Sequence, residues 1–230
     1  MIQIILDYKD AGPTLWLYVI GFCIAVVVAM CCHEYAHARV AYKCGDDTAK
    51  VSGRMTLNPL AHIDLLGMLS FVLVGFGWAK PVPINPVRFK EYRKGIFLTS
   101  VAGVITNFVI CFFASGLSIL FLYFASLYTG TSQFIMYLLQ FLFITFSLIS
   151  SVNFCLCIFN LLPIYPLDGF NVLQSVTKGT NRFVDFLKRY GTIILVVLLL
   201  TTLLETGMGY AVDYVLAPID SFWFKIIYGV

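Results

Sequence analysis

Charged side chains are scarce in this sequence. Only 12% of the 230 residues are Asp, Glu, Lys or Arg, whereas 60% are hydrophobic, and the mean hydropathy is +0.90. A soluble domain is usually about one quarter charged. So apolar a surface is stable only where lipid replaces water. The sequence therefore excludes an ordinary soluble protein and predicts an all-α polytopic membrane protein.

Basic tracts and a disulfide framework are also missing. The net charge is only +3 and no long Lys/Arg run is present, which argues against a nucleic-acid partner. Most of the seven cysteines lie inside apolar runs, where cysteine packs as a small hydrophobe. We expect them to be reduced packing residues.

Long apolar runs divide the chain into membrane spans. The first, residues 14–32, would make about 28 Å of helix, and its helix is expected to continue to about Lys43. It has no basic cap or clear cleavage site, which favours a span over a removed leader. Further spans are expected at residues 96–128, 134–162 and about 183–204, and the tail 209–230 is either a last crossing or an interfacial helix. The prediction is a bundle of about five to six transmembrane helices.

Two shorter segments lie between the first spans. Residues 65–78 are apolar but contain three glycines and are too short for a comfortable crossing. Residues 49–57, around Gly53, are predicted to form a short β-like membrane-associated element. Lys and Arg gather in short loops that belong on the cytosolic side. This placement requires 65–78 to be re-entrant, although a tilted short crossing stays open.

An H-E-x-x-H pattern occurs at the end of the first span, as His33-Glu34-Tyr35-Ala36-His37. Four residues advance a helix by about 400°, so both imidazoles stand on one face and can bind one Zn²⁺. Glu34 is then a candidate general base for hydrolysis. The alternative is a chance match. It is disfavoured because only three histidines occur in the chain and ionisable groups in a span are costly.

The third metal ligand is not fixed by spacing. Catalytic zinc usually has three protein ligands, and His62, Asp64 and Asp168 are the candidates. Asp168 follows a long apolar run and precedes Gly169, which would permit a close backbone approach. It could equally be a helix N-cap. His62 and Asp64 are expected to support the site by capping a segment or lining a water route, with a transient ligand role as the alternative.

Two separated motifs together resemble the site-2 protease family of intramembrane zinc metallopeptidases. The first is the H-E-x-x-H segment, and the second, Asn160-Leu161-Leu162-Pro163 with Leu167-Asp168-Gly169, is similar to the family's N-x-x-P-x-x-x-L-D-G signature. Ser100-Val101-Ala102-Gly103 followed by Asn107 resembles the start of a family core helix, although Val104 stands where proline is common. Residues 57–64 and 77–83 resemble the compact branch, which lacks PDZ and CBS domains. The resemblance covers roughly residues 30–175.

The resemblance implies one zinc ion per chain, held by His33, His37 and Asp168, with Glu34 as the catalytic base. It implies a site near the cytosolic face of a prokaryotic cell membrane and a transmembrane protein or peptide as substrate. Asn160 and Asn107 would then bind the substrate backbone, although Asn160 could instead make an interhelical hydrogen bond. An extended 50–57 segment could hold the unwound substrate by edge pairing.

The resulting prediction is a single intramembrane metalloprotease domain over residues 1–230. Its catalytic core would span about 14–175, and C-terminal helices would occupy about 180–230. The rival functions are a zinc transporter and a non-proteolytic binder of transmembrane helices. A transporter would place ligands along a path through several helices, whereas here the intramembrane polar groups concentrate at one motif.

Overall fold

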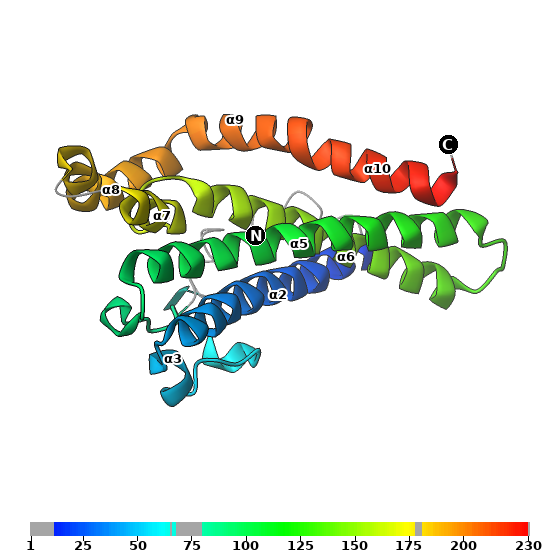
Figure 1. The fold of residues 1–230 in the computed structure, drawn as a ribbon. Helices are drawn as coiled ribbons and strands as arrows, with labels where there is room; N and C mark the ends of the chain where they lie inside the picture. Colours follow the sequence, from blue (N-terminus) through cyan, green and yellow to red (C-terminus); the bar gives the residue numbers. More distant parts are fainter. Residues whose placement is uncertain (1–11, 65, 68–79, 178–180, 230) are drawn as a thin grey trace.

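The computed structural model describes residues 12–64, 66–67, 80–177 and 181–229 (Figure 1). Within these residues every regular element is a helix, as predicted. In the described part of the chain, three helices are long and apolar enough to cross a membrane: α2 (Pro13–Cys44), α5 (Tyr92–Leu127) and α6 (Gln133–Leu161). They confirm the expected spans at 14–32, 96–128 and 134–162. The predicted dip at 65–78 lies almost entirely outside the described residues.

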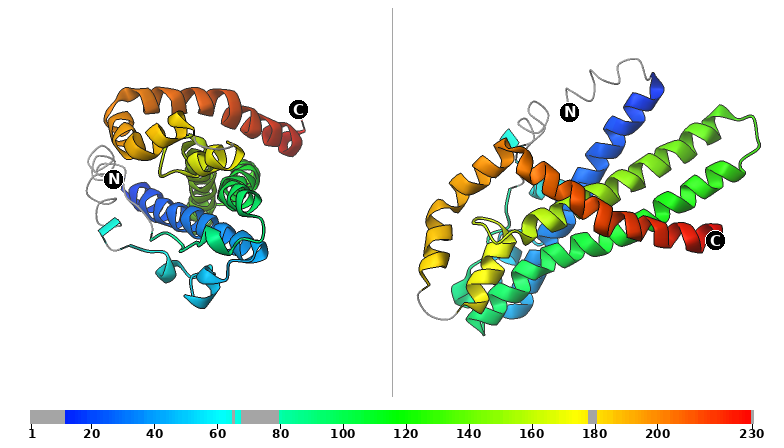
Figure 2. Two further views of the ribbon diagram at one scale, coloured as in Figure 1. Left: turned by 60° about the vertical axis from the view of Figure 1, so that its left-hand side comes forward. Right: turned by 90° about the horizontal axis from the view of Figure 1, so that it is seen from above.

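The three long helices pack into a bundle that small residues hold together. Ala25, Ala29, Ala38 and Ala41 of α2 are all fully buried. In lipid, apolar surface alone does not drive helices together, so side chains that permit close backbone approach dominate such contacts. Figure 2 shows α2, α5 and α6 running side by side. The bundle therefore brings the polar end of α2 against α5 and α6.

Helix α2 ends where the sequence places Gly45. Gly45 has φ +112°, a left-handed conformation that favours glycine. Its N–H donates to the Tyr42 carbonyl, and the Asp46 N–H donates to the Ala41 carbonyl at 3.0 Å. These two bonds satisfy two of the last four carbonyls of the helix.

The predicted β-like element at 49–57 is wrong. Residues Thr48–Val51 form a short helix, α3, and turns follow it through Gly53 at φ +69°. The reason lies in Asp46, whose carboxylate accepts bonds from the Thr48 N–H and hydroxyl and so fixes a helical turn. The 3₁₀ turns η1 (Pro59–Ala61) and η2 (Pro86–Arg88) are capped in the same way by Asn58 and Asn85.

Shorter helices complete the C-terminal part: α7 (Asp168–Val176), α8 (Arg182–Leu200), α9 (Thr202–Ala211), the π-helical η3 (Val212–Leu216) and α10 (Ala217–Tyr228). The span expected at 183–204 is interrupted, because α8 ends at Leu200 and Thr201 is extended. Figure 1 shows α9, η3 and α10 as one continuous course along the bundle. Trp223 fixes α10 to α5 by donating its indole N–H to the Phe112 carbonyl at 2.8 Å.

Candidate metal centre

The two histidines of α2 face the interior of the bundle. His33 and His37 are 8% and 6% exposed, and their Nε2 atoms lie 2.9 Å apart. Their ring planes are perpendicular, with centroids separated by 4.4 Å. One helical turn therefore brings both imidazoles to one point, as the motif spacing predicts.

Asp168, more than 130 residues further along the chain, reaches the same point. It is the first residue of α7, and its Oδ2 atom lies 3.2 Å from the Nε2 atoms of both His33 and His37. The N-cap of α7 is Leu167, and none of the described side chains caps this helix. The Asp168 carboxylate therefore faces the imidazoles and does not cap the helix.

Gly169 permits this placement. A Cβ atom at Gly169 would lie 2.3 Å from the carbonyl oxygen of Leu161 and 2.5 Å from that of Leu162. Such distances are far inside van der Waals contact. Only glycine lets α7 start directly against the end of α6, as the sequence indicated.

Helix α5 supplies two features of the site that the sequence did not identify. The Nδ1 atom of His37 donates a hydrogen bond of 2.7 Å to the Thr99 carbonyl, which can only accept. The neutral ring then presents the lone pair of Nε2 to the interior. One turn further along α5, a Cβ at Gly103 would lie 2.5 Å from His33 Cε1 and 2.6 Å from His37 Nε2. The imidazoles thus occupy the space that a side chain at residue 103 would need.

The donor atoms fit a zinc ion. His33, His37 and Asp168 each offer a ligand atom, and these atoms lie within 4.8 Å of one another. Tetrahedral ligands at about 2.0–2.1 Å from zinc lie about 3.3 Å apart, close to the 3.2 Å that separates Asp168 from each imidazole. Burial alone would raise the pKa of the Asp168 carboxyl, but hydrogen bonds and charge from His33 and His37 in their protonated form lower it to about 2. Asp168 is therefore an anion at neutral pH.

Glu34 is held by a segment far away in the sequence. Its Oε2 atom accepts a 2.8 Å hydrogen bond from the N–H of Val82. Val82 is buried and lies between Pro81 and Pro83, in a stretch without helix that prolines keep extended. This bond orients one oxygen of the carboxylate. The spacing of residues in the sequence does not predict this hydrogen bond.

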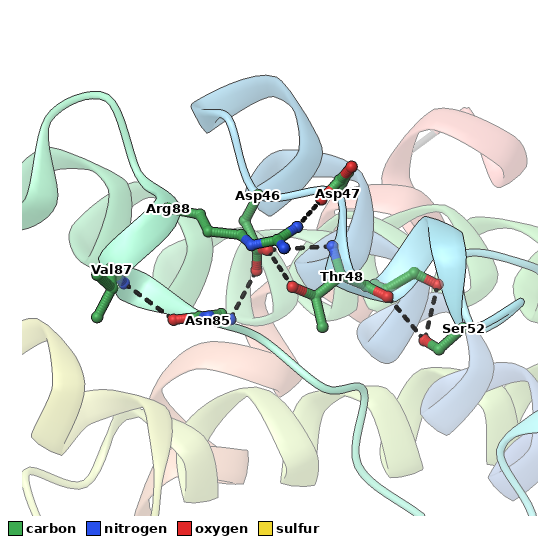
Figure 3. Close-up of polar contacts among 8 residues, drawn as sticks. Asp46, Asp47, Thr48, Ser52, Asn85, Val87 and Arg88 are labelled. Carbon is green, nitrogen blue, oxygen red and sulfur yellow. Dashed lines mark hydrogen bonds and ion pairs between the residues drawn. The ribbon is translucent and has the colours of Figure 1, made fainter.

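The extended segment around Val82, residues 80–85, is held by hydrogen bonds at both of its ends. Towards its N-terminus, the Lys80 N–H donates to the His62 carbonyl at 2.8 Å. Towards its C-terminus, the Asn85 N–H donates to Asp46 Oδ2 at 2.7 Å, and Arg88 pairs with Asp47 (Figure 3). Figure 3 also shows Asp46 holding Thr48, so one buried carboxylate joins the end of α2 to this segment.

The structure does not bring His62 or Asp64 into the donor cluster. The Nε2 atom of the buried His62 donates to the Thr56 carbonyl at 2.7 Å, which closes its own loop. Asp64 Oδ1 accepts from the Gly67 N–H at 2.8 Å, the geometry of a cap. Both contacts lie within residues 56–67, and a supporting role of His62 and Asp64 in the site stays a prediction.

The two asparagines differ in their surroundings. Asn107 lies one turn beyond Gly103 on α5, is completely buried, and neither of its polar side-chain atoms has a partner among the described residues. Asn160 donates to the Leu156 carbonyl of its own helix at 3.0 Å. This hydrogen bond of Asn160 is intrahelical, whereas the sequence analysis considered an interhelical one.

The sequence of this chain is similar to those of known proteins. The profile of peptidase family M50 matches residues 21–203. YwhC of Bacillus subtilis is 39% identical over 186 residues, which are 78% of this chain and 80% of that protein. Two proteins named Rip2, from Mycolicibacterium smegmatis and Mycobacterium tuberculosis, are 30% and 28% identical and match over 66% and 69% of their lengths. The names of all three mark them as candidate zinc metalloproteases. No solved structure matches the chain significantly.

Proposed function

Because the chain belongs to peptidase family M50 and is thus an intramembrane zinc metalloprotease, we propose that His33, His37 and Asp168 hold its zinc ion and that Glu34 is the general base. The observation that carries this assignment is the convergence of two Nε2 atoms and one carboxylate oxygen at 2.9–3.2 Å. Three groups that can each give an electron pair to a metal thus meet at one position, which is the number of protein ligands that a catalytic zinc ion usually has.

The residues at the site have different roles in the proposed reaction. A bound zinc ion would polarise a scissile carbonyl and acidify a water molecule. Glu34, with one oxygen fixed by Val82, keeps its other oxygen to accept a proton from the attacking water and return it to the leaving amine. Thr99 holds the His37 ring in the tautomer that binds metal, and Gly103 leaves the room that both rings need.

We further place the site near the cytosolic face. His37 lies seven residues before the end of α2 at Cys44, about 10 Å along the helix axis. Arg39, Lys43, Lys90 and Lys94 surround this end of the bundle, and basic loops favour the cytosol. The localisation that follows is a multi-pass protein of a prokaryotic cell membrane.

The substrate in this proposal is a transmembrane segment of another protein. A buried amide such as Asn107, one turn from Gly103 and without a protein partner among the described residues, is suited to bind an unwound substrate backbone. Asn160 is the second candidate for this role. Edge pairing at 50–57 is not part of the proposal, because those residues form α3 and turns.

The chain is proposed to be one metalloprotease domain, with its catalytic core at about 14–175 and C-terminal helices beyond it. Alongside the three apolar spans, α8 and the continuous α9–α10 course are the candidates for the remaining crossings of a bundle of five to six.

A Glu34→Gln variant tests the roles. Purified protein is incubated with a panel of membrane-spanning peptides, with and without a chelator, and zinc is measured by elemental mass spectrometry. Glu34→Gln should keep one zinc per chain and lose cleavage by about 10²–10⁴-fold, the usual contribution of a general base. Glu91→Gln, which only breaks an exposed pair with Lys94, is the matched control. Full cleavage by Glu34→Gln, or full zinc binding by Asp168→Ala, would refute the assignment.

A further inference from the structure

A groove runs along the outer side of the seam between α2 and α5. It encloses about 850 Å³, within the range of small-molecule sites. None of the three zinc-site residues lines it. Its wall on α2 includes Ala36 and Val40, and its wall on α5 includes Ala102 and Ile105. The groove is thus a separate feature of the two helices that build the metal centre.

One end of the groove is strongly basic. Arg39 and Lys43 of α2, Lys90, and Lys94 of α5 all line it and are all exposed. Lys94 is paired with Glu91 at 3.0 Å. The side chains of Arg39, Lys43 and Lys90 have no hydrogen bond or ion pair among the described residues, so three positive charges there are uncompensated. An anionic group would complement this end.

The rest of the groove is apolar and of limited depth. From Leu98 to Ile110, its last lining residue on α5, the helix rises about 18 Å, close to half of a hydrocarbon core of about 30 Å. Helix α5 itself continues to Leu127. A transmembrane helix would need an apolar groove along the whole core, whereas a lipid of one leaflet needs only half of it.

We propose that this groove binds an anionic phospholipid, with its phosphate at Arg39, Lys43 and Lys90 and an acyl chain between α2 and α5. Basic pockets between membrane helices on the cytosolic side bind anionic headgroups in this way. The bound lipid would brace the two helices that carry His33, His37 and Thr99. This inference does not depend on the proteolytic reaction.

Lipid binding to the purified full-length chain is measured by native mass spectrometry, with phosphatidylglycerol and phosphatidylcholine of identical acyl chains. We expect phosphatidylglycerol to bind preferentially with one tight site. Each basic residue near a headgroup contributes about fivefold, so Arg39→Gln with Lys43→Gln should weaken this site about 25-fold. Lys188→Gln with Arg189→Gln on α8 removes the same charge outside the groove and should change binding less than twofold.

Two further experiments test the proposed contacts of the acyl chain and of the phosphate. Ala102→Phe fills the apolar wall and should weaken phosphatidylglycerol although every cation remains, whereas Leu117→Phe on the same helix, outside the groove, should not. Inorganic phosphate at constant ionic strength should not displace the lipid. Equal binding of both lipids, equal losses in the two double variants, or displacement by phosphate would each overturn the proposal. So would displacement by an uncharged membrane-spanning peptide, which would assign the groove to a protein segment.

Discussion

Replacing Gly103 by alanine would place one methyl group inside the metal centre. The new Cβ would lie 2.5 Å from His33 Cε1, 2.7 Å from His33 Nδ1 and 2.6 Å from His37 Nε2. Ordinary contacts between such atoms begin near about 3.5 Å. Both imidazoles, or the helix that carries the methyl group, would have to move by about 1 Å. Zinc–ligand distances tolerate only about 0.2 Å.

Gly103→Ala should therefore weaken zinc binding more than it lowers the stability of the fold. Overpacking of this kind costs about 1–3 kcal/mol, but alanine is favoured over glycine inside a helix by about 1 kcal/mol. The free energy of unfolding should fall by only about 0–2 kcal/mol. Zinc affinity should fall at least 10–100-fold, the loss that displaced ligand supports usually cause, and cleavage should fall with it.

The assay pairs a zinc competition titration against a chromophoric chelator with thermal unfolding of the same samples. Gly116→Ala is the matched control, because it lies on the same helix and clashes with Trp223 at 2.8 Å instead of with the imidazoles. It should lower stability without changing zinc affinity. Gly207→Ala in α9, where no described residue lies within 4 Å of the added Cβ, should leave zinc affinity unchanged and raise stability by up to about 1 kcal/mol. Wild-type zinc affinity and cleavage in Gly103→Ala would refute the reasoning.

Two further outcomes follow from the contacts around Glu34 and Asp46. Val82→Pro removes the N–H that donates to Glu34 and should reduce kcat about 10-fold or more with zinc retained, the size expected when a charge-assisted hydrogen bond is lost. Val82→Ala keeps the N–H and should cleave normally, so equal activities of the two variants would contradict this role. For Asp46, burial alone would raise the carboxyl pKa, but bonds from Thr48 and Asn85 and the charge of Arg88 lower it. A lowered pKa means that the carboxylate stabilises the fold above its unfolded pKa of about 3.9 and that this contribution is lost as pH falls through the folded value. Asp46→Asn should cost about 1–3 kcal/mol at pH 7 and flatten the loss of stability below about pH 4. If the free energy of unfolding of Asp46→Asn, measured by chemical denaturation, falls below about pH 4 as steeply as that of the wild type, Asp46 does not titrate in this way.

The sequence was sufficient where local spacing decides the structure. Helical periodicity alone places His33 beside His37, and the apolar runs predicted the three long helices. The end of α2 at Gly45 likewise follows from a local preference for left-handed backbone. At 49–57 local reasoning failed, because Thr48 donates two hydrogen bonds to the Asp46 carboxylate, and these fix a helical turn where extended backbone was expected.

Tertiary contacts explain what spacing left open. Residue spacing alone did not distinguish a metal ligand from a helix cap at Asp168. The packing of α7 against α6 decides this, because it directs the carboxylate to the imidazoles. The Thr99 carbonyl and the Val82 N–H are backbone groups, which every residue possesses, so no residue type could mark them. Gly103 acts through the side chain it lacks, and its role requires knowledge of the neighbouring helix.

The contacts from Glu34 to Asp46 form a closed path that starts and ends at α2. Glu34 is held by Val82, the following stretch is held at Asn85 by Asp46, and Asp46 is tied back to Ala41 through its own N–H. The base thus gets its orientation from the same helix that carries the two imidazoles, by way of an extended segment that prolines keep stiff. Loosening that path at Asp46 should therefore lower kcat with zinc content unchanged. An equal loss of stability at Gly116, which is outside the path, should leave kcat intact.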